Sequence, residues 1–154
     1  MNLTEMWIQL VAAFFGTLGF ALIFQVRRKL LFWTALGGMI SWAVYLILDS
    51  VMHTIFVPYM CAAVAAAVYA QILARIQKVP ATIYLILALI PSIPGGALYY
   101  TMSNVVMKNW PEALSDGKRT LQYALAIAVG ISIVWAVTQI VERVRKSLRQ
   151  NPVG

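Results

Sequence analysis

The amino-acid sequence predicts an all-α integral membrane protein, a bundle of five transmembrane helices in which the fourth helix is broken. Two features of the composition and one of the pattern lead to this class. Hydrophobic residues make up 62% of the 154 residues. Charged residues make up only 11%, against about 25% in a typical soluble domain. The apolar residues also gather into long runs, as crossing a bilayer requires.

Five apolar windows are each long enough to cross a bilayer, which takes about 20 residues of helix. They cover residues 6–26, 30–48, 55–74, 81–102 and 121–141. No connection between them is long enough for a soluble domain, so residues 1–154 are treated as a single transmembrane domain. We expect the first window to be a retained span, because Met1 to Glu5 carry no positive charge and Arg27-Arg28-Lys29 follows in place of a small-residue cleavage site.

The positive charges predict the orientation of these spans. Nine of the twelve Lys and Arg residues fall in the first connection, the third connection and the C-terminal tail: Arg27, Arg28, Lys29, Arg75, Lys78, Arg143, Arg145, Lys146 and Arg149. Because Lys and Arg are enriched in cytoplasmic loops, we predict that the N-terminus lies outside and the C-terminus inside. The net charge of +7 therefore reflects topology and does not indicate a nucleic-acid partner.

Small residues recur at every fourth position in several windows, a spacing that lets helix backbones approach closely in lipid. The two longer stripes are Ala62, Ala66, Ala70, Ala74 and Ala124, Ala128, Ser132, Ala136. Shorter pairs are Gly37 with Ser41 and Ala12 with Gly16. We predict that these stripes are helix contacts, either within one chain or between subunits.

Tryptophan residues and turn signals predict what lies at the membrane surface. Three Trp residues near window ends are expected to anchor the chain at the lipid interface: Trp7, Trp33 and Trp110. Trp42 and Trp135 lie deeper, where core packing is the expected role. Turn signals at Asn109-Trp110-Pro111 and Ser115-Asp116-Gly117 predict an external loop over residues 103–118.

The fourth window is interrupted by Pro91-Ser92-Ile93-Pro94-Gly95-Gly96. Proline has no N–H and clashes with the carbonyl four residues back, so the carbonyls of Leu87 and Ile90 lose their helical partners. Such groups in hydrocarbon cost on the order of several kcal/mol each, and they occur where protein or a wet cavity meets them. A break at mid-depth is therefore a candidate binding site.

The second half of the broken span is predicted to begin near Pro94, since proline is favourable in the first turn of a helix. The N–H groups of Gly95, Gly96 and Ala97 would then be unpaired, and with the helix dipole they would favour an anion such as a carboxylate. The candidate substrate-binding residues are Ser92, Pro94, Gly95, Gly96, Tyr99 and, from the preceding span, Gln71. A proline kink that serves packing alone is the alternative interpretation.

The sequence argues against enzymatic and metal chemistry. No Asp, Glu, Lys, Arg or His lies in the middle of a window, and no nucleophile–base pair or acidic dyad lies at depth. One His and one Cys cannot build a zinc site alone, so we predict no catalytic residue, no metal and no cofactor. Topology explains Arg75 and Lys78, with recruitment of anions as a secondary alternative.

The run from Ile72 to Thr82, followed by the Pro91–Gly96 break and Ala97-Leu98-Tyr99-Tyr100-Thr101-Met102, resembles the threonine/serine exporter (ThrE) family. More narrowly, it is similar to the C-terminal membrane half of that family when this half is encoded as a separate small subunit. The matching residues are Arg75, Pro80, Pro94-Gly95 and Tyr99, and Gly37-Gly38 in the second window also fits.

The resemblance implies a multi-pass subunit of a secondary exporter in the inner or plasma membrane. The implied substrates are small carboxylate-bearing metabolites, either amino acids such as threonine and serine or small dicarboxylates such as succinate. The implied partner is a larger membrane subunit that resembles the N-terminal half of the family. The other expected partners are the small-molecule substrate and membrane lipid. A homo-oligomer of this chain is an open alternative. The alternative function is a structural or assembly subunit without its own substrate site.

Overall fold

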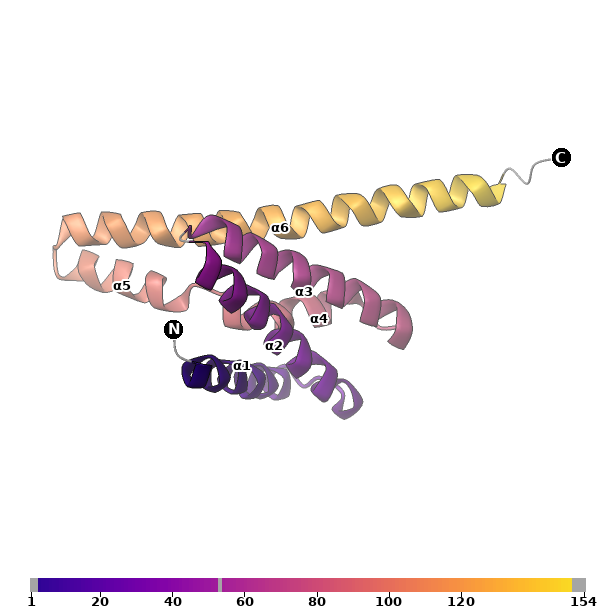
Figure 1. Cartoon of the computed structure of the whole chain (residues 1–154), viewed down its shortest axis with the longest axis horizontal. Coiled ribbons are helices and arrows are strands. Elements are labelled where there is room, and N and C mark those ends of the chain that lie inside the picture. Colours follow the sequence, from indigo (N-terminus) through magenta and orange to yellow (C-terminus); the bar gives the residue numbers. More distant parts are fainter. Residues whose placement is uncertain (1–2, 53, 151–154) are drawn as a thin grey trace.

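A computed structural model describes residues 3–52 and 54–150, and these residues form helices and no strand (Figure 1). The elements are α1 (Leu3–Ile23), α2 (Arg28–Val51), α3 (Phe56–Gln77), α4 (Ala81–Leu89), the 3₁₀ turn η1 (Ile90–Ser92), α5 (Gly95–Val106) and α6 (Trp110–Gln150). Four of these helices are long and apolar enough to cross a membrane, and the bent pair α4–α5 makes a fifth candidate span. The predicted fold class is therefore confirmed, including the break in the fourth span.

Helix α3 lies at the centre of the packing, because α2, α4 and α6 all contact it, whereas α1 packs mainly against α2. The core residues share small side chains on α3 and larger ones on its neighbours: Ala63, Ala66, Ala67 and Ala70 of α3, Tyr84 and Leu85 of α4, and Val134 of α6. Alanine methyl groups let neighbouring backbones approach closely. The core therefore forms around the alanine surface of α3.

The predicted small-residue stripes have different outcomes. Ala62, Ala66 and Ala70 of α3 are buried, as are Gly37 and Ser41 of α2, so these helix contacts are confirmed. Ala74, the last residue of the predicted α3 stripe, is half-buried.

For the other two stripes, on α6 and α1, the predicted contact within one chain is wrong. On α6 the four predicted residues, Ala124, Ala128, Ser132 and Ala136, are exposed, and on α1 so are Ala12 and Gly16. The inward faces are formed by equally small neighbours: Ala126 and Gly130 on α6, and Ala13, Thr17 and Ala21 on α1. A contact of the exposed stripes with another subunit stays a prediction.

Two glycines mark the closest approaches between helices. A Cβ atom on Gly130 would lie 2.5 Å from the carbonyl oxygen of Met60 and 2.9 Å from Cβ of Ala63. Helices α6 and α3 therefore touch through the backbone at this point. A Cβ atom on Gly38 would overlap the buried hydroxyl of Thr17, so α1 and α2 also depend on a missing side chain.

The predicted external loop over residues 103–118 is wrong. Helix α5 continues to Val106 and α6 begins at Trp110, so only residues 107–109 connect them. The two helices form an antiparallel hairpin that extends past the ends of α1, α2 and α3 (Figure 1). Asn104 donates a hydrogen bond to the Asp116 carboxylate at 3.0 Å, and the hydroxyl oxygens of Thr101 and Thr120 lie 3.4 Å apart. These contacts stabilise polar residues inside a helix where the sequence alone indicates a turn.

The deeper tryptophans also have different outcomes. Trp42 stacks on Tyr45 with ring centroids 4.6 Å apart, in a row of aromatic contacts that continues through Tyr59 of α3 to Tyr123 of α6. Its predicted packing role is confirmed. Core packing is wrong for Trp135, which is 39% exposed on α6.

The basic connections lie at one end of the bundle. The α1–α2 connection, the α3–α4 connection and the C-terminal part of α6 lie toward the same side, and the α2–α3 and α5–α6 connections lie toward the other (Figure 1). This is the alternation that five spans require. That the basic end faces the cytoplasm stays a prediction, which rests on the distribution of Lys and Arg.

A topology reporter tests this orientation. Fluorescent protein fused after α6 should fold and emit, because the C-terminus is expected in the cytoplasm, whereas alkaline phosphatase fused there should be inactive. Fusions in the 107–109 connection should give the opposite pair of results. The reverse pattern at both positions would overturn the predicted orientation.

A methyl group at Gly130 should destabilise the bundle, because it meets backbone that cannot rotate away. We expect Gly130→Ala to lower the free energy of unfolding by about 1–3 kcal/mol, measured by thermal denaturation in detergent micelles. Gly16→Ala is the matched control, since a Cβ atom at Gly16 meets nothing within 4 Å. Equal stability of the two variants would contradict the backbone contact.

Candidate functional site: the helix break and a basic cavity

The break between α4 and α5 bends the fourth span by 57°. Both carbonyls that the prolines deprive of helical partners find other donors. The N–H of Ile90 donates to the Leu87 carbonyl, and the N–H of Ile93 donates to the Ile90 carbonyl at 3.2 Å. These are bonds to the third residue back, as in a 3₁₀ helix. The chain therefore satisfies these two carbonyls by itself, and they do not need the wet cavity that was one of the predicted partners.

Helix α5 begins at Gly95, and Pro94 directly precedes it with no side chain capping this start. The N–H of Gly95 is not free as expected, because it donates to the Ile93 carbonyl at 2.7 Å. Gly96 and Ala97 hold the first-turn positions whose N–H groups have no partner within an α-helix. The predicted anion site is thereby reduced from three backbone donors to two.

Ser92 faces the inside of the bundle. It is 1% exposed, and its Oγ lies 3.4 Å from Oγ of Ser41 on α2. Ser41 in turn donates to the carbonyl of Ala62 on α3 at 3.2 Å. Ser92 therefore connects η1 to two neighbouring helices, and it does not cap α5.

Gly95, Gly96 and Tyr99 lie on the outside of this chain. A Cβ atom at either glycine would meet nothing within 4 Å, and Tyr99 is 68% exposed. Among the described helices, α5 contacts α6 alone. In a single chain, the predicted substrate site is thus an open surface.

Gln71 lies elsewhere, half-buried on α3. It lines a cavity of about 380 Å³ between α3 and α6, together with Arg75 and Thr138. The Arg75 guanidinium donates to the Glu142 carboxylate across the same two helices at 3.2 Å. The predicted site residues therefore fall on three surfaces: Ser92 inside the bundle, Gln71 beside α6, and the glycines with Tyr99 outside.

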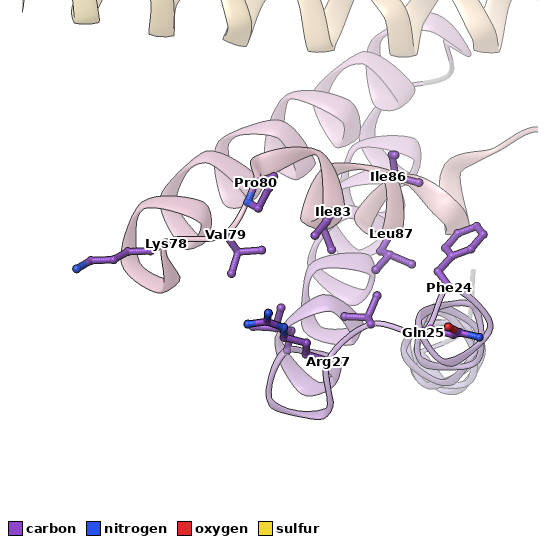
Figure 2. Close-up of a pocket in the computed structure, with 11 residues that line it drawn as sticks. Phe24, Gln25, Arg27, Lys78, Val79, Pro80, Ile83, Ile86 and Leu87 are labelled. Carbon is purple, nitrogen blue, oxygen red and sulfur yellow. The ribbon is translucent and has the colours of Figure 1, made fainter.

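A larger cavity, about 540 Å³, lies at the basic end between the α1–α2 connection, the α3–α4 connection and α4 (Figure 2). Arg27 and Lys78 are the charged residues among the eleven that line it, and Gln25 is the other polar one. Topology was the predicted explanation for these cations, and the cavity beside them was not predicted. The signal that could have found it is the position of each cation just before a helix start.

Both connections around this cavity have the same local structure. Gln25 and Lys78 adopt the left-handed conformation, each with φ of 53°. The next residues, Val26 and Val79, donate back to the carbonyls of Ala21 and Ala74 at 3.0 and 3.2 Å. This is the Schellman arrangement of a helix end. It turns both valines against the core and sends the chain directly into α2 and α4, whose starts have no side-chain cap.

Several apolar spans, one of them broken, define a multi-pass α-helical membrane protein. The family model described as Threonine/Serine exporter, ThrE, matches residues 9–137, a region that includes the break and the basic cavity. The chain therefore belongs to the threonine/serine exporter family, and the resemblance noted from its motifs is confirmed. No curated protein and no solved structure matches the chain.

The contact between Ser41 and Ser92 can be measured by a double-mutant cycle. We expect Ser41→Ala and Ser92→Ala to show a coupling of about 0.6 kcal/mol, the average for polar pairs between membrane helices. Thermal unfolding of both single variants and the double variant in detergent gives this value. Strictly additive losses would show that the two hydroxyls do not interact.

Proposed function

We propose that this chain is the membrane subunit of a secondary exporter in the inner or plasma membrane. It moves small carboxylate-bearing metabolites, either threonine- and serine-type amino acids or small dicarboxylates, together with a larger partner subunit. Membership of the threonine/serine exporter family supports export as the activity. The observation that carries the proposed site is the open, uncapped start of α5.

The start of α5 suits a carboxylate. The N–H groups of Gly96 and Ala97 and the positive end of the helix dipole favour an anion there. No side chain lies within 4 Å of where a Cβ of Gly95 or Gly96 would be, so a ligand can reach the backbone. Pro94 fixes the turn, and Tyr99 lies on the same exposed segment. We leave Ser92 and Gln71 outside the proposed site because their side chains contact other surfaces.

A partner subunit is part of this proposal because the site is open. An anion at a surface that faces hydrocarbon loses its hydration without enough compensation. The predicted spans also hold no acidic residue at mid-depth that could pair with the ammonium group of an amino acid. A second subunit that covers α5 would exclude lipid and supply the missing charge.

The break itself favours a second candidate, a structural or assembly subunit. Both carbonyls deprived of partners are satisfied within the chain, and Ser92 is fixed against α2. A break of this kind is complete without a ligand, and its exposed half can serve as a docking surface for the partner alone.

A bulky residue at Gly96 separates the two functions. We expect Gly96→Leu to insert and fold normally, since a side chain there meets nothing in this chain, and to abolish threonine efflux because it covers the backbone donors. Efflux is measured from cells that express the chain with its larger subunit, loaded with labelled threonine.

The matched control is Gly19→Leu on α1, a position outside the predicted stripes where a Cβ atom also meets nothing within 4 Å. Normal efflux by a well-inserted Gly96→Leu variant would rule out the proposed site. Lost efflux with the two subunits still purifying together supports substrate binding at Gly96. Loss of the partner from the purified complex would favour the assembly function.

A further inference from the structure

We propose that the basic cavity at the α1–α2 and α3–α4 connections binds an anionic phospholipid, with the phosphodiester at the rim and an acyl chain along the apolar wall. The inference does not depend on the proposed export site, which lies on α5. It rests on three properties of the cavity: the charge of its rim, the character of its wall and the absence of acidic groups from its lining.

The rim is positively charged. In Figure 2 the nitrogen-bearing ends of Arg27 and Lys78 both point to the left of the view, away from Ile83, Leu87 and Phe24. Helix α2 begins at the residue after Arg27, and α4 begins three residues after Lys78; neither start has a side-chain cap. The unpaired N–H groups and dipoles of two helix starts therefore add to the charge of two side chains.

No carboxylate offsets this charge. None of the eleven residues that line the cavity is acidic. Of the five acidic residues in the chain, only Glu142 lies toward this end of the bundle, and its carboxylate already accepts from Arg75. An oxyanion is the ligand that this rim favours.

The apolar wall of the cavity favours an amphiphilic ligand over a small hydrophilic solute. The other eight lining residues are apolar, and Figure 2 shows Val79, Ile83 and Leu87 pointing toward the side on which Arg27 lies. Phe24 and Ile86 are more than half exposed, at 56% and 55%, so the apolar wall continues onto the outer surface of the bundle. A free phosphate or a short carboxylate shares the rim chemistry but leaves this wall empty. Basic pockets between membrane helices that bind lipid headgroups have this arrangement.

Native mass spectrometry of the purified full-length chain tests the site. The probes are phosphatidylglycerol, which is anionic, and phosphatidylcholine, which carries no net charge, each added to the protein in neutral detergent. We expect phosphatidylglycerol to bind preferentially, and the double variant Arg27→Gln/Lys78→Gln to weaken that binding about tenfold or more. Equal binding of the two lipids would overturn the proposal.

The matched control is Arg143→Gln/Lys146→Gln, which removes two exposed charges from the same end of the bundle outside the cavity. The proposal requires this control to bind phosphatidylglycerol within twofold of the unmodified chain. An equal loss in both double variants would mean that general surface charge attracts the lipid, and the cavity site would be rejected.

Two further measurements keep the test decisive. If the Arg27→Gln/Lys78→Gln chain fails to fold, Ile86→Glu replaces it, because a carboxylate at the half-exposed wall should repel the phosphodiester. Inorganic phosphate, threonine and succinate at millimolar concentration are then added as competitors. Retained lipid supports the proposal, whereas displacement by any of these solutes would assign the cavity to a small anion.

Discussion

The alanine surface of α3 is the constraint on which the rest of this structure depends. Because Ala63, Ala66 and Ala70 carry only methyl groups, the neighbouring helices pack close to α3. At Gly130 there is no side chain, so the backbone of α6 contacts α3 directly. Helix α4 rests on the same surface, so α3 supports the first half of the broken span. In lipid, where the hydrophobic effect does not hold helices together, such close packing is a principal source of association. A chain this apolar therefore obtains a defined shape from its smallest side chains.

Backbone pairing explains why the break and the basic cavity persist in an apolar environment. At η1, two bonds of the 3₁₀ type replace those that the prolines remove. At the ends of α1 and α3, left-handed residues fold the next N–H back onto the preceding turn. In each case local bonds complete the carbonyl end of a helix, while the N–H groups at the start of the following helix keep no side-chain cap. At these junctions, the backbone groups left without a side-chain partner are thus N–H groups, and they lie at helix starts.

The apolar runs and the Pro91–Gly96 cluster were sufficient to predict the fold class, the candidate membrane spans and the position of the break, because length and proline chemistry determine them. The rotation of each helix could not be predicted. On α6, Ala124 and Ala128 and the residues two positions on, Ala126 and Gly130, are equally small, so spacing does not say which set faces α3. The turn signals near Asp116 failed because a contact with Asn104, distant in sequence, stabilises that helix.

The candidate site residues lie on separate surfaces, again because the rotation of each helix could not be predicted. Arg27 and Lys78 were assigned to orientation, and only the folded chain places them beside one cavity.

The length of α6 gives the molecule a mechanical property. Its 41 residues extend about 60 Å, roughly twice the thickness of the hydrocarbon layer, and they run without interruption from the α5 hairpin past the contact at Gly130. The two limbs of the broken span rest on different supports, α4 on α2 and α3, and α5 on α6 alone. Helix α3 holds α6 through the backbone contact at Gly130 and, further along, through the Arg75–Glu142 ion pair. A change in the bend that moves α5 therefore has to bend α6 or shift it against α3.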